Sequence, residues 1–173
     1  SATLVNKDGL WWNSGAGTAG DGRQFWYTEY DYNSTISNTL NGGVACCSTG
    51  DFVTWNFEGI LFHYTNITDL VKNYPGPYYV ERPVVMYNSY TQQFVMWATM
   101  DSYYNRSLAM SVIMTSPYID GPFLFNRAFY PDGNQTRDQI AYMNGGNQPV
   151  LARNYYNTIE FVLPDAQMQP TWE

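Results

Sequence analysis

The chain has 173 residues, a formal net charge of −7, few charged residues and many aromatic residues, Tyr above all. This length suits one domain and is short for two. The acidic balance argues against nucleic acid and against an anionic membrane surface as partners, because both attract Lys and Arg, and no apolar run approaches the length of a membrane span.

Short apolar stretches bounded by turn residues recur along the whole chain and predict about eleven β-strands. Trp55 follows a turn, which indicates a place in the core of a sheet, and one helical turn is expected near residues 68–71. No amphipathic helix is expected, so the fold class is all-β. The expected strands are residues 2–6, 24–30, 43–48, 52–62, 79–88, 90–97, 108–115, 123–129, 137–143, 150–153 and 158–163.

Four strands in the middle of the chain, residues 81–88, 94–101, 108–115 and 123–129, would make one four-stranded blade. Its first strand begins with Glu81 and Arg82, and the strand at Arg137 and Asp138 begins another unit in the same way. This repetition favours a β-propeller over a β-sandwich and places Glu81 and Asp138 at equivalent ends of inner strands, facing one central cleft. The alternative is an unrelated β-sandwich, in which the two carboxylates need not share a cleft.

Several polar residues are candidates for a site in this cleft. Glu29 stands among aromatic residues, which is unusual for a carboxylate unless it is paired, and Arg82 or Arg137 is the expected partner. Trp11 and Trp12 are adjacent and face opposite ways in an extended chain, so one of them can line the cleft. For Glu81 and Arg82 the alternative is a solvated strand end with no functional role.

The two cysteines, Cys46 and Cys47, are adjacent. Neighbours on a strand point to opposite faces, so an ordinary disulfide between them is not expected, and at least one should be a buried thiol. Two cysteines and one histidine, His63, do not supply a convincing zinc site. We therefore expect neither a metal nor a cofactor.

Four N-x-[ST] sequons occur in polar stretches that are typical of loops, the position that suits an N-linked glycan. Together with the low charge and abundant Tyr, they favour a secreted, extracellular glycoprotein. The expected glycosylation sites are Asn33, Asn66, Asn105 and Asn134.

Motifs that run in order over nearly the whole chain resemble glycoside hydrolase family 43, in its branch of exo-β-1,3-galactanases (galactan 1,3-β-galactosidases). Each motif alone is weak, but together they are fairly specific. They are Phe25-Trp26-Tyr27-Thr28-Glu29, Gly43-Val44-Ala45-Cys46, Phe57-Glu58-Gly59, Glu81-Arg82-Pro83-Val84-Val85-Met86-Tyr87-Asn88, Phe94-Val95-Met96-Trp97, Ser116-Pro117, Gly121-Pro122-Phe123 and Arg137-Asp138.

This resemblance implies a five-bladed β-propeller, of which residues 1–173 form a single partial domain of about three blades. It also implies hydrolysis of glycosidic bonds with inversion, in which one carboxylic acid protonates the leaving oxygen while a second group activates water. Glu81 matches the family's substrate-contacting glutamate, and Asp138 matches the aspartate that orients the acid and tunes its pKa. The family's general acid would lie beyond residue 173. The implied substrate-binding residues are Glu29, Arg82, Arg137, Trp12 and Ser14.

Three positions depart from the family pattern. Ser14 stands where the family usually has histidine, Val84 stands where a lysine is common, and residues 144–147 replace an Asp-rich turn. These departures favour a glycosylated propeller module that binds a galactan-like carbohydrate or builds an extracellular wall, coat or filament without catalysis. The alternative is an active inverting exo-β-1,3-galactanase whose general acid lies outside this chain. In both cases other protein segments or chains are expected to complete the propeller, because three blades leave two sheet edges exposed.

Overall fold

A computed structural model of the chain describes residues 2–6, 23–31, 41–67, 76–88, 91–104, 106–143, 149–155 and 158–162. The regular elements in these residues are eleven β-strands and two short 3-10 turns, η2 (Tyr64–Asn66) and η3 (Pro131–Gly133). In this part of the chain no helix is long and apolar enough to cross a membrane. The strands are β1 (Ala2–Asn6), β2 (Gln24–Asp31), β3 (Asn41–Thr49), β4 (Asn56–His63), β5 (Tyr78–Asn88), β6 (Gln93–Ser102), β7 (Met110–Ser116), β8 (Leu124–Phe129), β9 (Gln139–Met143), β10 (Pro149–Tyr155) and β11 (Thr158–Val162).

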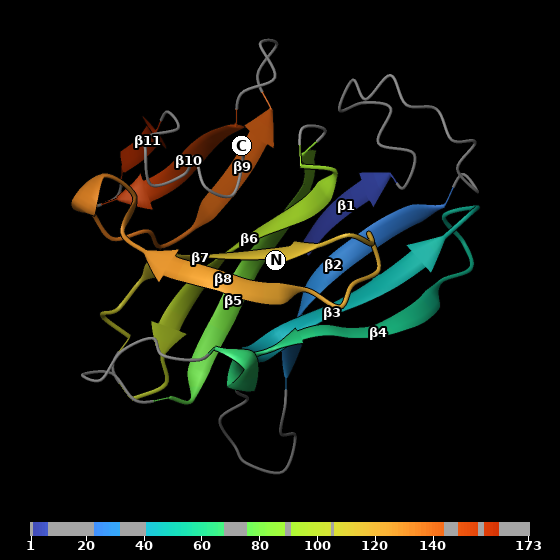
Figure 1. Cartoon of the computed structure of the whole chain (residues 1–173), viewed down its shortest axis with the longest axis horizontal. Helices are drawn as coiled ribbons and strands as arrows, with labels where there is room; N and C mark the ends of the chain where they lie inside the picture. Colours follow the sequence, from blue (N-terminus) through green and yellow to red (C-terminus); the bar gives the residue numbers. More distant parts are fainter. Residues whose placement is uncertain are drawn as a thin grey trace.

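The strands form three antiparallel sheets in chain order. Strands β1–β4 form blade 1, β5–β8 form blade 2 and β9–β11 form blade 3, and within each blade consecutive strands pair with one another. Figure 1 shows the three blades side by side, with blade 2 in the middle. The predicted all-β fold, with about three propeller blades, is confirmed.

Strand β4 begins four residues later than expected, because a turn occupies residues 51–54. The carboxylate of Asp51 accepts hydrogen bonds from the backbone N–H groups of Val53 and Thr54, and the hydroxyl of Thr49 accepts from Phe52. These side chains satisfy backbone donors that a strand ladder would otherwise use. The helical turn expected at residues 68–71 lies outside the described residues.

Blades 1 and 2 share one apolar core. One face of blade 1 carries Phe25, Tyr27, Val44 and Cys46, and they join Val80 and other residues of blade 2 in a single buried cluster. Cys46 is a buried free thiol, as expected, and burial raises its pKa well above the ordinary value. The core fixes how blade 1 and blade 2 stack, and thereby places the end of β2 beside the bulged part of β5.

Candidate functional site

A β-bulge interrupts β5 at Arg82. Glu81 lies opposite Thr99 and Val84 lies opposite Trp97, so the two residues between Glu81 and Val84 face a single residue of β6. Arg82 has a φ of 58°, in the left-handed region that is unfavourable for a residue with a side chain. The strand was expected over residues 79–88 and runs from Tyr78 to Asn88, so the Glu-Arg-Pro motif and Pro83 lie inside it. Proline fits there because β5 is the edge strand of its blade and a bulge needs no ladder hydrogen bond from it.

Arg82 connects all three blades. Its backbone N–H donates to Oε1 of Glu29 on β2 of blade 1, at 3.0 Å. Its side-chain Nε lies 2.8 Å from Oδ1 of Asp138, just ahead of β9 of blade 3. The expected contact of Glu29 with Arg82 is therefore present, through the backbone of Arg82. We call Glu29, Glu81, Arg82 and Asp138 the blade corner.

Glu81 contacts a second arginine, Arg106, which the sequence did not predict as part of the site. Nη2 of Arg106 lies 3.9 Å from Oε1 of Glu81, and the guanidinium stands 3.9 Å from the ring centroid of Tyr79. Tyr79 and Glu81 are two positions apart on β5, so they share a face of the sheet. Hydrogen bonding with Tyr79 and, next, the nearby charge of Glu81 raise the pKa of Arg106. The ring of Tyr79 thus provides a surface that holds this cation beside Glu81.

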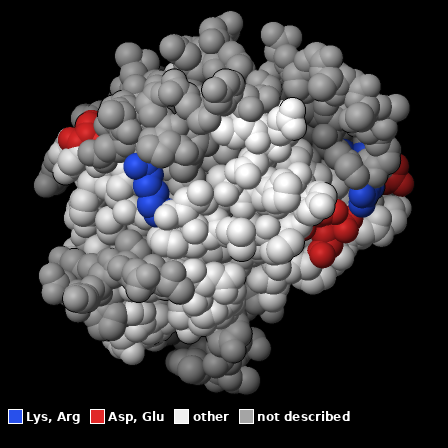
Figure 2. All heavy atoms as spheres, in the orientation of Figure 1, with Lys and Arg blue, Asp and Glu red and all other residues white. Residues whose placement is uncertain are grey.

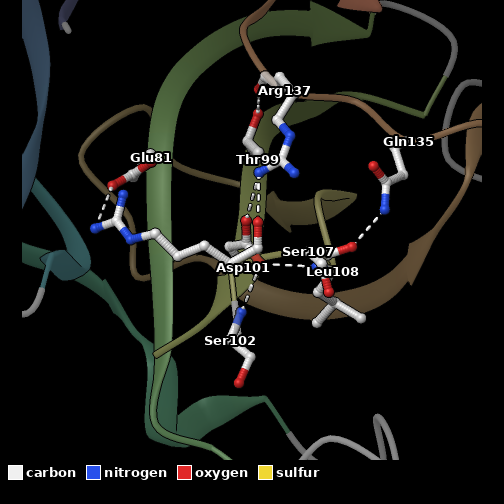
Figure 3. A network of polar contacts seen from close by, with 9 residues as sticks. Glu81, Thr99, Asp101, Ser102, Ser107, Leu108, Gln135 and Arg137 are labelled. Carbon is white, nitrogen blue, oxygen red and sulfur yellow. Dashed lines mark hydrogen bonds and ion pairs between the residues drawn. The ribbon is translucent and has the colours of Figure 1, made fainter. Parts of the chain in front are cut away.

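Arg137 belongs to a network centred on Asp101 (Figure 3). The buried carboxylate of Asp101 accepts hydrogen bonds from the backbone N–H groups of Ser102 and Leu108, each at 2.9 Å, and Nη1 of Arg137 lies 3.1 Å from its other oxygen. Arg137 also donates to the carbonyl of Arg106, and its own carbonyl accepts from the hydroxyl of Thr99. These contacts fix residues 106–108 and the start of blade 3, and with them the position of Arg106.

The other predicted site residues fall into two groups. Trp12, Ser14, Asn33 and Asn105 lie outside the described residues. Asn66 is exposed at the end of η2, whereas Asn134 is half-buried and its Nδ2 lies 3.4 Å from Oδ1 of Asp132.

Tyr79, Asp101 and Arg106 were not predicted from the sequence as site residues. The alternation of Tyr79 with Glu81 was a usable signal, because period-2 spacing puts both side chains on one face. Arg106 had no such signal, since it lies in a loop whose path depends on the Asp101 network.

Among the described residues, charged side chains are sparse on the face that Figure 2 shows. Figure 2 shows blue and red atoms in a few small groups, separated by a broad uncharged area of the described residues. At the blade corner two carboxylates each form an ion pair with an arginine. Asp138 pairs with Arg82, and Glu81 pairs with Arg106. Among the described residues no group of three or more His, Cys, Asp and Glu side chains could hold a metal ion.

The blade corner combines hydrogen-bond acceptors and donors that remain open to solvent. The side chains of Arg82 and Asp138 are 44% and 61% exposed, and Glu81 is partly exposed. Carboxylates accept and guanidinium groups donate, so such a group can bind several hydroxyls of one ligand at once. The ion pairs orient both carboxylates, which suits a ligand-contacting role.

Comparison with known proteins identifies the fold. No family model and no curated protein matches the sequence. Among solved structures, the exo-β-1,3-galactanase of Phanerochaete chrysosporium with galactose is 21% identical with a TM-score of 0.69, over 86% of this chain and 34% of that one. An exo-β-1,3-galactanase of Clostridium thermocellum is 27% identical with a TM-score of 0.63, over 78% of this chain and 29% of that one.

A third structure, a family 43 β-1,3-galactosidase, is 22% identical with a TM-score of 0.70, over 86% of this chain and 31% of that one. The chain therefore spans about a third of the length of these proteins. The expected resemblance is confirmed for the fold: the described residues have the architecture of part of a glycoside hydrolase family 43 propeller.

Proposed function

We propose that this glycoside hydrolase-like module binds a β-1,3-galactan-type carbohydrate at the blade corner and that residues 1–173 do not cleave it. The observation that carries the proposal is the convergence of Glu29, Arg82 and Asp138, from three different blades, through two contacts of Arg82. Solved proteins of the same fold hold galactose or β-1,3-galactotriose, which supports a galactose-based ligand.

The surroundings of Glu81 and Asp138 suit ligand binding better than proton transfer. Inverting hydrolysis needs one carboxylic acid that protonates the leaving oxygen and a partner about 6.5–9.5 Å away. The resemblance places that acid beyond residue 173, whereas Glu81 and Asp138 each face an arginine and Asp138 is open to solvent. Both groups therefore suit orientation of a sugar through hydrogen bonds.

The second candidate function is an active inverting exo-β-1,3-galactanase whose general acid comes from sequence outside residues 1–173. It is favoured by the presence of both Glu81 and Asp138, the residues that match the family motif, at neighbouring points of the corner. In either function we expect further propeller blades from other segments or chains, with residues 1–173 as one part of the domain.

The test is galactan binding and galactose release by the full-length native protein, beside Glu81→Gln and Asp138→Asn. Asp51→Asn is the matched control, since Asp51 is an exposed carboxylate on a hairpin turn of blade 1. Binding without release, weakened at least tenfold by Glu81→Gln and unchanged by the control, is the expected result, since each 1.4 kcal/mol of lost contact is tenfold in affinity. Release of galactose that Glu81→Gln abolishes would establish the enzyme instead. If the protein shows no binding and no release, both functions are contradicted.

We also propose that the protein is secreted and N-glycosylated, in an extracellular assembly such as a wall, coat or filament. Asn66 is the best-supported site in the described residues, because its side chain is exposed on a short turn. Removal of N-glycans from the native protein, followed by peptide mapping, should show modification at Asn66. An unmodified Asn66 in protein from its natural source would count against this localisation.

A further inference from the structure

A row of aromatic side chains leads away from the blade corner, at the end of blade 2 where β5 begins and β6 ends. The ring of Tyr79 stacks on Tyr103 with ring centroids 5.7 Å apart, and Tyr103 and Tyr104 form an edge-to-face pair at 5.3 Å. The guanidinium of Arg106 stands 3.9 Å from the ring centroid of Tyr79 and 3.9 Å from Oε1 of Glu81. A continuous series of contacts therefore joins Glu81 of the corner to Tyr104. We call Tyr79, Tyr103 and Tyr104 the tyrosine row.

Burial decreases along the tyrosine row from the core to the surface. Tyr79 is 6% exposed, Tyr103 is half-buried and Tyr104 is 73% exposed. A single exposed tyrosine is ordinary on a protein surface. Tyr104 differs because its ring continues a packed series that begins at a candidate ligand site. It lies two residues from Arg106, so the Cα atoms of the two are at most about 7.6 Å apart.

Backbone contacts hold the segment that carries the tyrosine row. The N–H of Tyr103 donates to the carbonyl of Pro77 at 2.9 Å, just ahead of β5. The N–H of Leu108 donates to the carboxylate of Asp101 at 2.9 Å. A ring that is held in place before a ligand arrives loses less conformational freedom on binding, which favours affinity.

A second pair of exposed aromatic rings lies on blade 1. The edge of Trp26 meets Trp55 with ring centroids 6.0 Å apart, and the two side chains are 41% and 39% exposed. Trp55 was expected in the core of a blade, and its exposure corrects that expectation. Trp26 faces away from blade 2, because it lies between Phe25 and Tyr27, which are both fully buried in the core shared with blade 2. The tyrosine row, which contacts the corner through Arg106, is therefore the better candidate for an extension of the site.

We propose that Tyr104, supported by Tyr103, forms a second sugar subsite that stacks on a neighbouring galactose unit of the chain bound at the blade corner. The inference rests on the proposed function and adds to it a ligand of at least two units. The axial hydroxyl of galactose leaves the C–H groups on one face of the sugar ring uncovered. A tyrosine ring offers a rigid apolar surface to such a face while its hydroxyl stays in water. The corner then binds the hydroxyls of one unit, and the tyrosine row binds the apolar face of another.

NMR titration of the full-length native protein with galactose and with β-1,3-galactotriose tests the subsite. Tyr104→Ala should weaken galactotriose binding about tenfold, which corresponds to about 1.4 kcal/mol, and should leave galactose binding unchanged, because a single unit fills only the corner. Tyr104→Phe keeps the ring and should keep the affinity. The matched control is Tyr118→Ala, because Tyr118 is 63% exposed on the turn between β7 and β8, at the opposite end of blade 2. If the protein cleaves galactotriose, Tyr104→Ala should raise KM tenfold and leave kcat unchanged.

The sugar signals in the same titration report the stacking itself. Hydrogens that lie above an aromatic ring shift upfield, so bound galactotriose should show upfield C–H signals with the wild type and with Tyr104→Phe, and should lose them with Tyr104→Ala. Unchanged galactotriose affinity in Tyr104→Ala, an equal loss for galactose, or a matching loss in Tyr118→Ala would overturn the subsite and leave the proposed function intact. If neither sugar binds the wild type, the proposed function fails and the subsite fails with it.

Discussion

The two seams between blades are built differently. Blade 1 meets blade 2 through an apolar core, with the hydroxyl of Tyr27 donating to the carbonyl of Ile119 and the N–H of Phe123 donating to the carbonyl of Leu61. Blade 2 meets blade 3 through Ala141 and Leu151, which join the same core, and in addition through a chain of polar contacts, among them Arg137 with Asp101 and Ser111 with Gln139. We call these the apolar seam and the polar seam.

The difference assigns a separate task to each seam. Burial of apolar surface makes a large, non-directional contribution to the free energy of folding. The apolar seam therefore supplies stability without fixing the orientation of individual polar groups. Hydrogen bonds and ion pairs are directional, so the polar seam fixes the angles at which Arg106 and Asp138 are presented. The candidate site accordingly lies where the polar seam meets the bulge of β5.

The largest expected effect comes from a cavity in the apolar seam. Phe62 on β4 is 1% exposed and belongs to the shared core. Phe62→Ala should lower the free energy of unfolding by about 3–5 kcal/mol, through lost burial and the cavity that remains. Urea unfolding of the full-length protein measures it, with Leu124→Ala as the exposed control. A loss below about 1 kcal/mol would show that the seam repacks freely, contrary to a close-packed core.

The second-largest loss of stability is expected for a substitution in the polar seam. Asp101→Ala removes the acceptor of two backbone N–H groups and the partner of Arg137, and should cost about 2–4 kcal/mol, because buried donors are left without partners. Asp101→Asn keeps an acceptor oxygen and should cost less. Urea unfolding and galactan affinity, measured for both Asp101 variants, test this expectation. Equal losses for both variants would mean that charge matters here and the backbone hydrogen bonds do not.

A smaller effect, with a distinctive pH dependence, is expected for Tyr27. Burial, and then the nearby Cys46 and Asp120, raise the pKa of Tyr27 well above the ordinary 10.0. Folding therefore disfavours the ionised form, so the stability contributed by the neutral hydroxyl is complete below pH 10 and falls as the pH rises above 10. Tyr27→Phe should cost about 1 kcal/mol at neutral pH through loss of the bond to Ile119.

Thermal unfolding of both proteins from pH 7 to 11 measures this difference. The wild type should lose stability more steeply than Tyr27→Phe above pH 10, so the gap between them narrows. Parallel curves would show that the hydroxyl of Tyr27 does not titrate differently in the folded and unfolded protein.

Sequence alone predicted the parts of this architecture that depend on strand periodicity and strand ends. The blade order and the meeting of Arg82 with Glu29 follow from where charged residues interrupt apolar strands. The bulge at Arg82 was not predicted, because its left-handed backbone depends on the pairing of β5 with β6. Arg106 was missed for a related reason, since a loop residue is placed by contacts far away in sequence.

The exposed ion pair of the blade corner gives the smallest expected effect on stability. Arg82 and Asp138 are close but largely solvated, and such pairs contribute about 0.2–1 kcal/mol in double-mutant cycles. A double-mutant cycle of Arg82→Gln and Asp138→Asn should therefore show a coupling free energy in this range. The coupling should shrink in 1 M salt, because the Debye length is then only about 3 Å. Galactan affinity should fall more than stability in both single variants, because the pair orients groups for a ligand. A coupling above about 2 kcal/mol would instead make the corner a structural clamp between blades 2 and 3, and the polar seam would then stabilise the fold as the apolar seam does.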